Sequence, residues 1–157
     1  MNLVLRAKAA ADLCTCRGGQ MKSIVASAII LFSGSAFAGS SAGYGMGGLF
    51  NRFDPVVSQY NQSGELFRIQ GHCQSACTLF LGIRNVCVER SARLLFHAGH
   101  DRNKNIKPAE TAHMLSAYNP QLRAFVTANH YMDTLDFHTI SGADMIQKFG
   151  YKACPNK

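Results

Sequence analysis

Residues 71–78 read Gly-His-Cys-Gln-Ser-Ala-Cys-Thr and join two segments of different character. Before them, residues 65–70 alternate between polar and apolar side chains, which predicts a short β-strand that ends at Gly71. After them, the run that begins at Ser75 is apolar on nearly all sides, which predicts a buried helix. The quoted stretch is therefore expected to be a tight turn from a strand into a helix, with Ser75 at the start of the helix.

Further helices and strands are expected on both sides of this turn. They are a helix over 49–62, strands at 85–88 and 92–97, a polar loop over 98–107, and helices over 111–118, from residue 122 and from residue 141. The order helix, strand, helix, strand, strand and then helices predicts an α/β domain with a small, mostly parallel sheet and flanking helices.

Residues 21–38 have the pattern of a secretory signal peptide. A short basic start is followed by an apolar run and by a small-x-small cleavage pattern that ends at Ala38. We therefore expect residues 1–20 to be an over-extended start and cleavage to follow Ala38, with an uncleaved anchor as the alternative. The remaining residues, 39–157, would form one domain in the periplasm or outside the cell, and the signal segment would be its one membrane contact.

Cysteine usage agrees with export. Two of the six cysteines precede residue 39, which leaves an even number in the expected domain. In an oxidising compartment such a set predicts up to two disulfides, with three alternative connectivities. The candidates are Cys73, Cys77, Cys87 and Cys154. The sequence does not select among the pairings.

The net charge of +7 does not indicate nucleic-acid binding. Part of it precedes residue 39, and the remaining basic residues form no stripe with interleaved aromatic side chains. Arg102, Lys104 and Lys107 do cluster, within the expected loop. The chain has no phosphate-binding loop and no dinucleotide fingerprint, so no cofactor is expected. The expected partners are a peptide substrate or another protein.

Ser75 and His97 are the candidate catalytic residues. A serine at a strand-to-helix turn lies beside unpaired backbone amides, which can receive a developing oxyanion. His97 follows a strand expected to be parallel, so it would emerge at the same sheet edge, where open α/β sheets place their sites. A base there would accept the proton that serine must lose before it can attack. The alternatives are that Ser75 only caps a helix and that His97 is a core histidine.

These motifs resemble the Clp protease proteolytic subunit and the wider Clp/crotonase superfamily. The similarity rests on Gly71-x-x-x-Ser75 before an apolar helix, on a Val-Cys-Val strand, and on a strand that ends in His97. The segments Gly-x-Cys-x-Ser-Ala-Cys-Thr and Phe-His-Ala are more closely similar to small exported bacterial members. The resemblance extends over residues 47–154, with its specific motifs between Gly71 and His97.

The resemblance implies an exported serine hydrolase, peptidase-like, on a truncated Clp/crotonase-like fold. Ser75 would be the nucleophile and His97 the general base. A glycine pair that opens the preceding helix in the family matches Gly47-Gly48. The amides of Gly48 and Ala76 would then form the oxyanion hole.

The family's third catalytic residue would lie just before the last helix. Asp136 is nearest, about one residue out of register, and Asp133 and Asp144 are the alternatives. The family proteases also have a further strand and helix before the glycine loop. This difference leaves a sheet edge for a partner or a second copy, so the chain is a candidate homo-oligomer. Cysteines flank Ser75 where the family has small residues, and a bridge between them would make the turn rigid but crowded.

Other site chemistries use the cysteines and histidines. The candidate zinc ligands are His72, Cys73, Cys77, Cys87, His97 and His100. Zinc accepts such donors, but thiols of an exported protein tend to oxidise, so no metal is expected. Cys77 is conceivable as a thiolate nucleophile in the first turn of a helix. The alternative function is a non-catalytic, disulfide-stapled binding or assembly module on the same fold.

Overall fold

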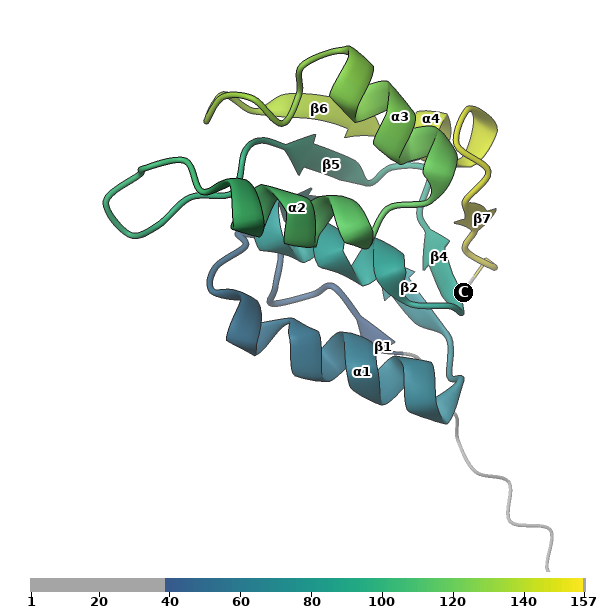
Figure 1. Cartoon of the computed structure of the whole chain (residues 1–157). Helices are drawn as coiled ribbons and strands as arrows, with labels where there is room; N and C mark the ends of the chain where they lie inside the picture. The colour runs from purple at the N-terminus through teal and green to yellow at the C-terminus, as the bar shows by residue number, and fades with distance from the viewer. Residues whose placement is uncertain (1–38, 157) are drawn as a thin grey trace, which may run out of the picture. The chain divides into compact units, whose positions relative to one another are not determined.

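The computed structural model describes residues 39–156 as a mixed α/β domain with a small parallel sheet and flanking helices (Figure 1). The expected signal peptide lies outside the described residues. In chain order, with η for 3-10 helices, the elements are β1 (Gly39–Ser40), η1 (Phe50–Arg52), α1 (Asp54–Ser63), β2 (Phe67–Ile69), β3 (His72–Gln74), η2 (Ser75–Gly82), β4 (Val86–Val88), β5 (Arg93–Phe96), α2 (Pro108–Ser116), α3 (Pro120–Ala128), β6 (His138–Ser141), α4 (Gly142–Gln147) and β7 (Lys152–Ala153).

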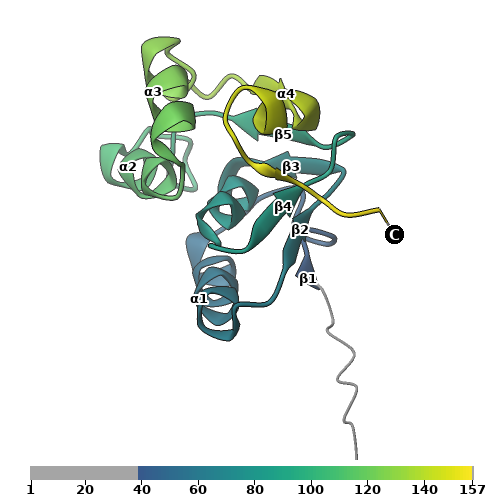
Figure 2. The ribbon, with the colours of Figure 1, turned by 90° about the vertical axis from the view of Figure 1, so that its right-hand side faces the viewer.

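The first sheet contains four parallel strands in the order β1-β2-β4-β7. Its strand β4 has the sequence Val-Cys-Val and is buried throughout, as expected of a parallel strand covered on both faces. Figure 2 shows α1, η2 and α2 on one side of this sheet. Because η2 contacts β4 as well as α1 and α2, it is the element that joins the sheet to the helical layer.

A second sheet of three strands, in the order β3-β5-β6, was not expected from the sequence. The sequence pattern predicts a single sheet and a turn from Gly71 to Ser75, and both details are wrong. Gly71 has a left-handed φ of 62° and redirects the chain, so β2 pairs in the first sheet and β3 in the second. The chain changes sheets again between β4 and β5, where the Arg93 amide donates to the Gly71 carbonyl over 2.8 Å.

The buried helix predicted after Ser75 is present as η2 and forms the centre of the core. Residues 76–81 are all buried. Phe80 packs against Phe53 and Phe67, with ring centroids 5.4 and 4.6 Å away. Eight residues is long for a 3-10 helix, so the tertiary packing rather than intrinsic preference maintains this winding.

The other helices begin close to where the sequence predicts. α2 and α3 begin at Pro108 and Pro120, where the missing N–H of proline costs no hydrogen bond. The side chains of Asn119 and Ser141 cap α3 and α4 by accepting hydrogen bonds from first-turn amides. The strands β1, β6 and β7 were not expected, and β6 pairs with β5 in the antiparallel direction.

Two disulfides, Cys73–Cys77 and Cys87–Cys154, join the four candidate cysteines. The first spans Ser75, and the second ties β4 to the chain after β7, 67 residues later. These bonds are compatible with an extracellular or periplasmic protein. None of the helices within residues 39–156 has the length and apolar character that a membrane span requires.

Removal of the Cys87–Cys154 disulfide is expected to destabilise the domain, because the bond restricts the unfolded chain over a long loop. The variant Cys87→Ala/Cys154→Ala should lose about 2–5 kcal/mol of unfolding free energy. Urea denaturation followed by circular dichroism measures the difference. Unchanged stability would show that the strand pairing of β7 with β4 holds the C-terminal segment without the covalent bond.

Candidate active site

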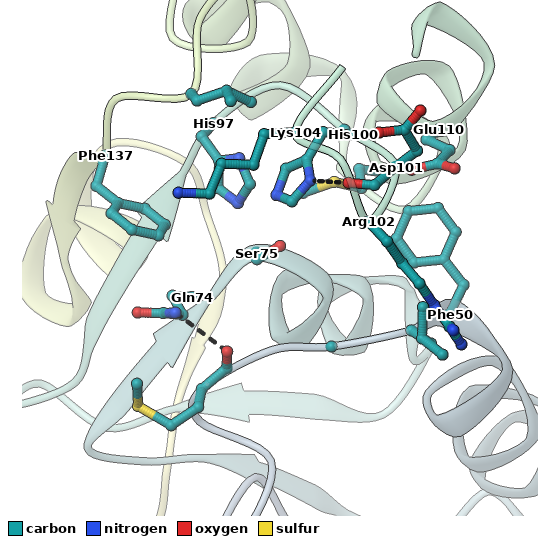
Figure 3. A pocket seen from close by; sticks show the side chains of 16 residues that line it. Phe50, Gln74, Ser75, His97, His100, Asp101, Arg102, Lys104, Glu110 and Phe137 are labelled. Carbon is teal, nitrogen blue, oxygen red and sulfur yellow. Dashed lines mark hydrogen bonds between the residues drawn. The ribbon is translucent and has the colours of Figure 1, made fainter. Parts of the chain in front are cut away.

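A cleft of about 790 Å³ holds both candidate catalytic residues (Figure 3). Five segments line it: the glycine loop with the start of η1, the junction of β3 with η2, the chain that follows β5, helix α2, and the chain that precedes β6. Figure 3 shows the imidazoles of His97 and His100 facing Ser75 across this cleft. Its volume is in the range of roughly 300–1,000 Å³ that is common for ligand sites.

The parallel pairing of β3 with β5 brings Ser75 and His97 to the same cleft. Gln74 and Leu95 are partners in this pairing, so Ser75 and Phe96 follow at neighbouring positions and His97 comes next. Adjacent strands are about 4.8 Å apart, which places the two chain segments side by side. The topology therefore agrees with the expectation that Ser75 and His97 emerge at the same sheet edge. The edge belongs to the three-stranded sheet β3-β5-β6.

Ser75 has a backbone conformation that residues other than glycine rarely adopt. Its φ is 54°, which lies in the left-handed region. The Cys73–Cys77 disulfide spans it, and the Thr78 hydroxyl donates to its carbonyl over 2.7 Å. Ser75 does not cap η2, because Gln74 occupies the N-cap and no side chain caps it. Its hydroxyl makes no hydrogen bond with another described residue, and Ser75 lines the cleft.

A buried pair of hydroxyls supports Ser75 from within the core. The Thr78 hydroxyl oxygen lies 2.6 Å from that of Tyr118. Thr78 uses its one hydroxyl hydrogen for the Ser75 carbonyl, so Tyr118 must be the donor of this second hydrogen bond. Burial raises the pKa of Tyr118 well above its usual range, which keeps the proton in place. No local sequence pattern indicates this link, because it joins residues 40 positions apart.

His97 is buried in the wall of the cleft, with 3% of its surface exposed. Its ring packs edge-on against Phe137 and beside His100, with centroids 4.8 and 5.5 Å away. Burial lowers the pKa of His97 below its ordinary 6.5; the Ala98 backbone opposes this shift, and the charge of His100 adds to it. The imidazole is therefore mostly neutral near pH 7 and able to accept a proton.

The structure does not join an acid to His97. Its Nδ1 atom is buried and has no hydrogen-bond partner among residues 39–156, whereas in a catalytic triad a carboxylate occupies that position. Asp136 is exposed, and its carboxylate accepts a hydrogen bond within its own turn. Asp133 and Asp144 form ion pairs elsewhere. Among residues 39–156, the site thus contains a serine and a histidine without the third residue that the resemblance implies.

The glycine loop lies directly against Ser75. Gly47 and Gly48 have φ of 71° and 141°, and a Cβ on Gly47 would lie 2.8 Å from the Gln74 carbonyl oxygen and 2.9 Å from the Ser75 Cβ. Gly48 lines the cleft, and its amide donates to no other described residue. The Ala76 amide belongs to the first turn of η2, where amides lack helical partners. These are the two donors assigned to an oxyanion hole from the sequence.

Both cysteines that flank Ser75 are oxidised. Because the Cys73–Cys77 disulfide is fully buried, neither sulfur is available as a thiolate nucleophile or a zinc ligand. Cys87 is also in a disulfide. The described residues contain no group of three or more ligand-type side chains that could hold a metal ion. The hypotheses of a Cys77 nucleophile and of a cysteine–histidine zinc site are therefore wrong.

Most of the residues that surround the two catalytic candidates were not predicted from the sequence. Met46, Leu49 and Phe137 line the cleft from irregular segments, where no periodic pattern could indicate their direction. Arg102 and Lys104 also line it, and their clustering in the sequence was the one available signal. These residues determine which ligands the cleft can accept.

No protein-family model, curated protein or solved structure matches the chain. The geometry of the cleft and the arrangement of the two sheets are therefore the basis for inferring what the protein does.

Alanine at Gly47 is expected to cost more stability than alanine at Gly43. Both glycines have left-handed φ, so each substitution costs about 1 kcal/mol in backbone strain. A Cβ on Gly43 meets nothing within 4 Å, whereas on Gly47 it meets Gln74 and Ser75. Gly47→Ala should therefore lose a further 1–3 kcal/mol or so in urea denaturation. Equal losses would mean that the loop does not press on Ser75.

His97 is expected to titrate below pH 6.5, as measured by two-dimensional NMR of the imidazole nitrogens. The variant His100→Ala removes the neighbouring imidazole whose charge lowers the pKa of His97, so it should raise this pKa, while His130→Ala, at an exposed position outside the cleft lining, should not. Because the unfolded imidazole binds its proton more readily, stability should fall as the pH drops below about 6.5. Titration of His97 at or above pH 6.5 would contradict its burial.

Proposed function

We propose that the protein is an exported serine hydrolase, peptidase-like, in which Ser75 is the nucleophile and His97 the base. The observation that supports it most is that three features meet at one cleft: the left-handed backbone of Ser75, the buried neutral imidazole of His97, and a glycine loop packed closely against Ser75. The left-handed φ of a residue other than glycine and the buried imidazole with an unpartnered Nδ1 atom each cost stability, and such costs concentrate at functional sites. Export rests on the expected signal peptide, and the two disulfides are compatible with it.

The reaction would be acyl transfer through an ester of Ser75. The imidazole of His97 takes the hydroxyl proton while the serine oxygen bonds to the carbonyl carbon of the substrate. The negative charge on the former carbonyl oxygen would be stabilised by the amides of Gly48 and Ala76. The leaving amine or alcohol departs with the proton from His97, and water, activated by the same imidazole, then hydrolyses the ester.

The Clp/crotonase-like fold is part of the proposal. A strand, a tight turn with a serine, a buried helix and a following parallel strand with a terminal histidine are the features that the family shares with this chain. The order of β3, η2 and β5, with β5 parallel to β3, supports this part of the proposal, although β3 was not expected from the sequence. The periplasm is the expected location for the activity.

A non-catalytic binding or assembly module on the same fold is the second candidate. Two observations favour it: the Ser75 hydroxyl makes no hydrogen bond with His97, and no carboxylate reaches the Nδ1 atom of His97 within residues 39–156. A buried disulfide around the serine would then serve rigidity alone. The two candidates differ in whether the serine reacts.

A fluorophosphonate probe, which labels activated serines, tests the proposal. The wild-type protein should be labelled, Ser75→Ala should not, and His97→Ala should react about 10²–10⁴ times more slowly because the base is lost. Ser116→Ala and His130→Ala are matched controls at exposed positions outside the cleft and should react like wild type. Circular dichroism confirms that each variant is folded. A folded wild-type protein that stays unlabelled supports the binding module instead.

A further inference from the structure

The chain between β5 and α2 forms an ordered loop around Asp101. The Asp101 carboxylate accepts hydrogen bonds from the amides of Asn103 and Asn105, each at 2.9 Å, and lies 3.2 Å from the Lys107 ammonium. The hydrogen bonds, led by those of Asn105, lower the pKa of Asp101 to about 2. The carboxylate therefore stays charged, and the loop has a defined shape.

Two cations of this loop have no partner of their own. Asp101 and Lys107 compensate each other, whereas the side chains of Arg102 and Lys104 form no ion pair or hydrogen bond with another described residue. Both are exposed and line the cleft, and Figure 3 shows them extending in different directions from the loop. Lys107 lies outside the lining and neutralises Asp101 there, so Arg102, Lys104 and Glu110 are the remaining charged lining residues, with a surplus of one positive charge.

The rim of the same cleft exposes large apolar side chains. Phe137, Leu49 and Met46 are 48%, 53% and 74% exposed. They are three of the four exposed large apolar residues in the described part of the chain, and the fourth, Ile106, belongs to the cationic loop. Such a concentration at one cleft indicates a surface that a ligand covers, because apolar area in contact with water is unfavourable.

We propose that the cleft binds acidic peptides in which a Glu or Asp residue lies next to a large apolar residue. The choice of a peptide rests on the proposed hydrolase function, and the sequence preference goes beyond it. The apolar side chain packs on Leu49 and Phe137, and the carboxylate is attracted by Arg102 and Lys104. A basic side chain in its place brings like charges together and is rejected.

The variant Ser75→Ala allows binding to be measured without turnover. Its affinity for capped pentapeptides with Glu, Gln or Lys next to Leu is determined by isothermal titration calorimetry at low salt. The affinity should decrease in the order Glu, Gln, Lys, and replacement of the peptide Leu by Ala should weaken binding. Raising the salt to about 0.5 M should reduce the preference for Glu, since exposed charges are screened.

Substitutions in the loop assign the preference to its cations. In the Ser75→Ala background, Arg102→Gln and Lys104→Gln should each reduce the preference for Glu over Gln by about two- to fivefold. Lys152→Gln removes an equal charge from β7, outside the cleft, and should leave the preference unchanged. Both loop positions are exposed, so these variants should fold, which circular dichroism verifies.

Three results would overturn the inference: no measurable binding, equal affinity for the three charge variants of the peptide, or a preference for Glu that survives both loop substitutions. These results are distinct from a failure of the proposed function. Fluorophosphonate labelling of wild type without a preference for acidic peptides would reject the inference and leave the hydrolase intact. A preference for acidic peptides without labelling would reject the hydrolase and leave the binding site.

Discussion

The parallel hydrogen bonding of β3 with β5 is the interaction on which the candidate site depends. Ser75 follows β3 and His97 follows β5, so the register of these strands fixes the relative positions of the two side chains. A slip by one residue would turn the side chains of one strand to the opposite face. The pairing spans three residues, too few to be stable alone. It is supported by β6 along the other edge of β5 and by the disulfide between β3 and η2.

A second constraint is the left-handed backbone conformation of Ser75. This conformation is unfavourable for a residue other than glycine, so contacts with the surrounding structure must maintain it. The disulfide fixes the residues on both sides of the serine, and Thr78, with Tyr118 behind it, fixes the serine carbonyl. The loop at Gly47 leaves no space for the turn to relax towards it. All of these contacts restrain the backbone, while the hydroxyl remains unbonded to any described residue. This division, a restrained backbone and a free reactive group, is what a pre-organised nucleophile requires.

The sequence predicted the parts of the fold that depend on local patterns. Apolar spacing located the helices, and the Val-Cys-Val run located a buried strand. The second sheet was not predictable in this way, because β3 is a three-residue strand with polar ends and its partners come later in the chain. The prediction of Asp136 as the third catalytic residue was not supported, for a related reason. The resemblance implied an acid just before the last helix, and Asp136 is nearest to that position. The direction of its side chain, however, is set within its own turn, where its carboxylate accepts a hydrogen bond from the Thr134 hydroxyl.

The absence of an acid beside His97 in the described residues has a chemical consequence. When a histidine accepts a proton in acyl transfer, the imidazolium needs a nearby negative charge, which a triad supplies through Nδ1. Here burial and the neighbouring His100 both disfavour the protonated form of His97. Under the proposed function, the neutral imidazole can accept a proton, but the imidazolium that results is poorly stabilised. An acidic peptide in the cleft would bring a negative charge to this cationic, apolar environment. Under the proposed function, the ligand that fits the loop is therefore also the one that best compensates the charge that His97 acquires.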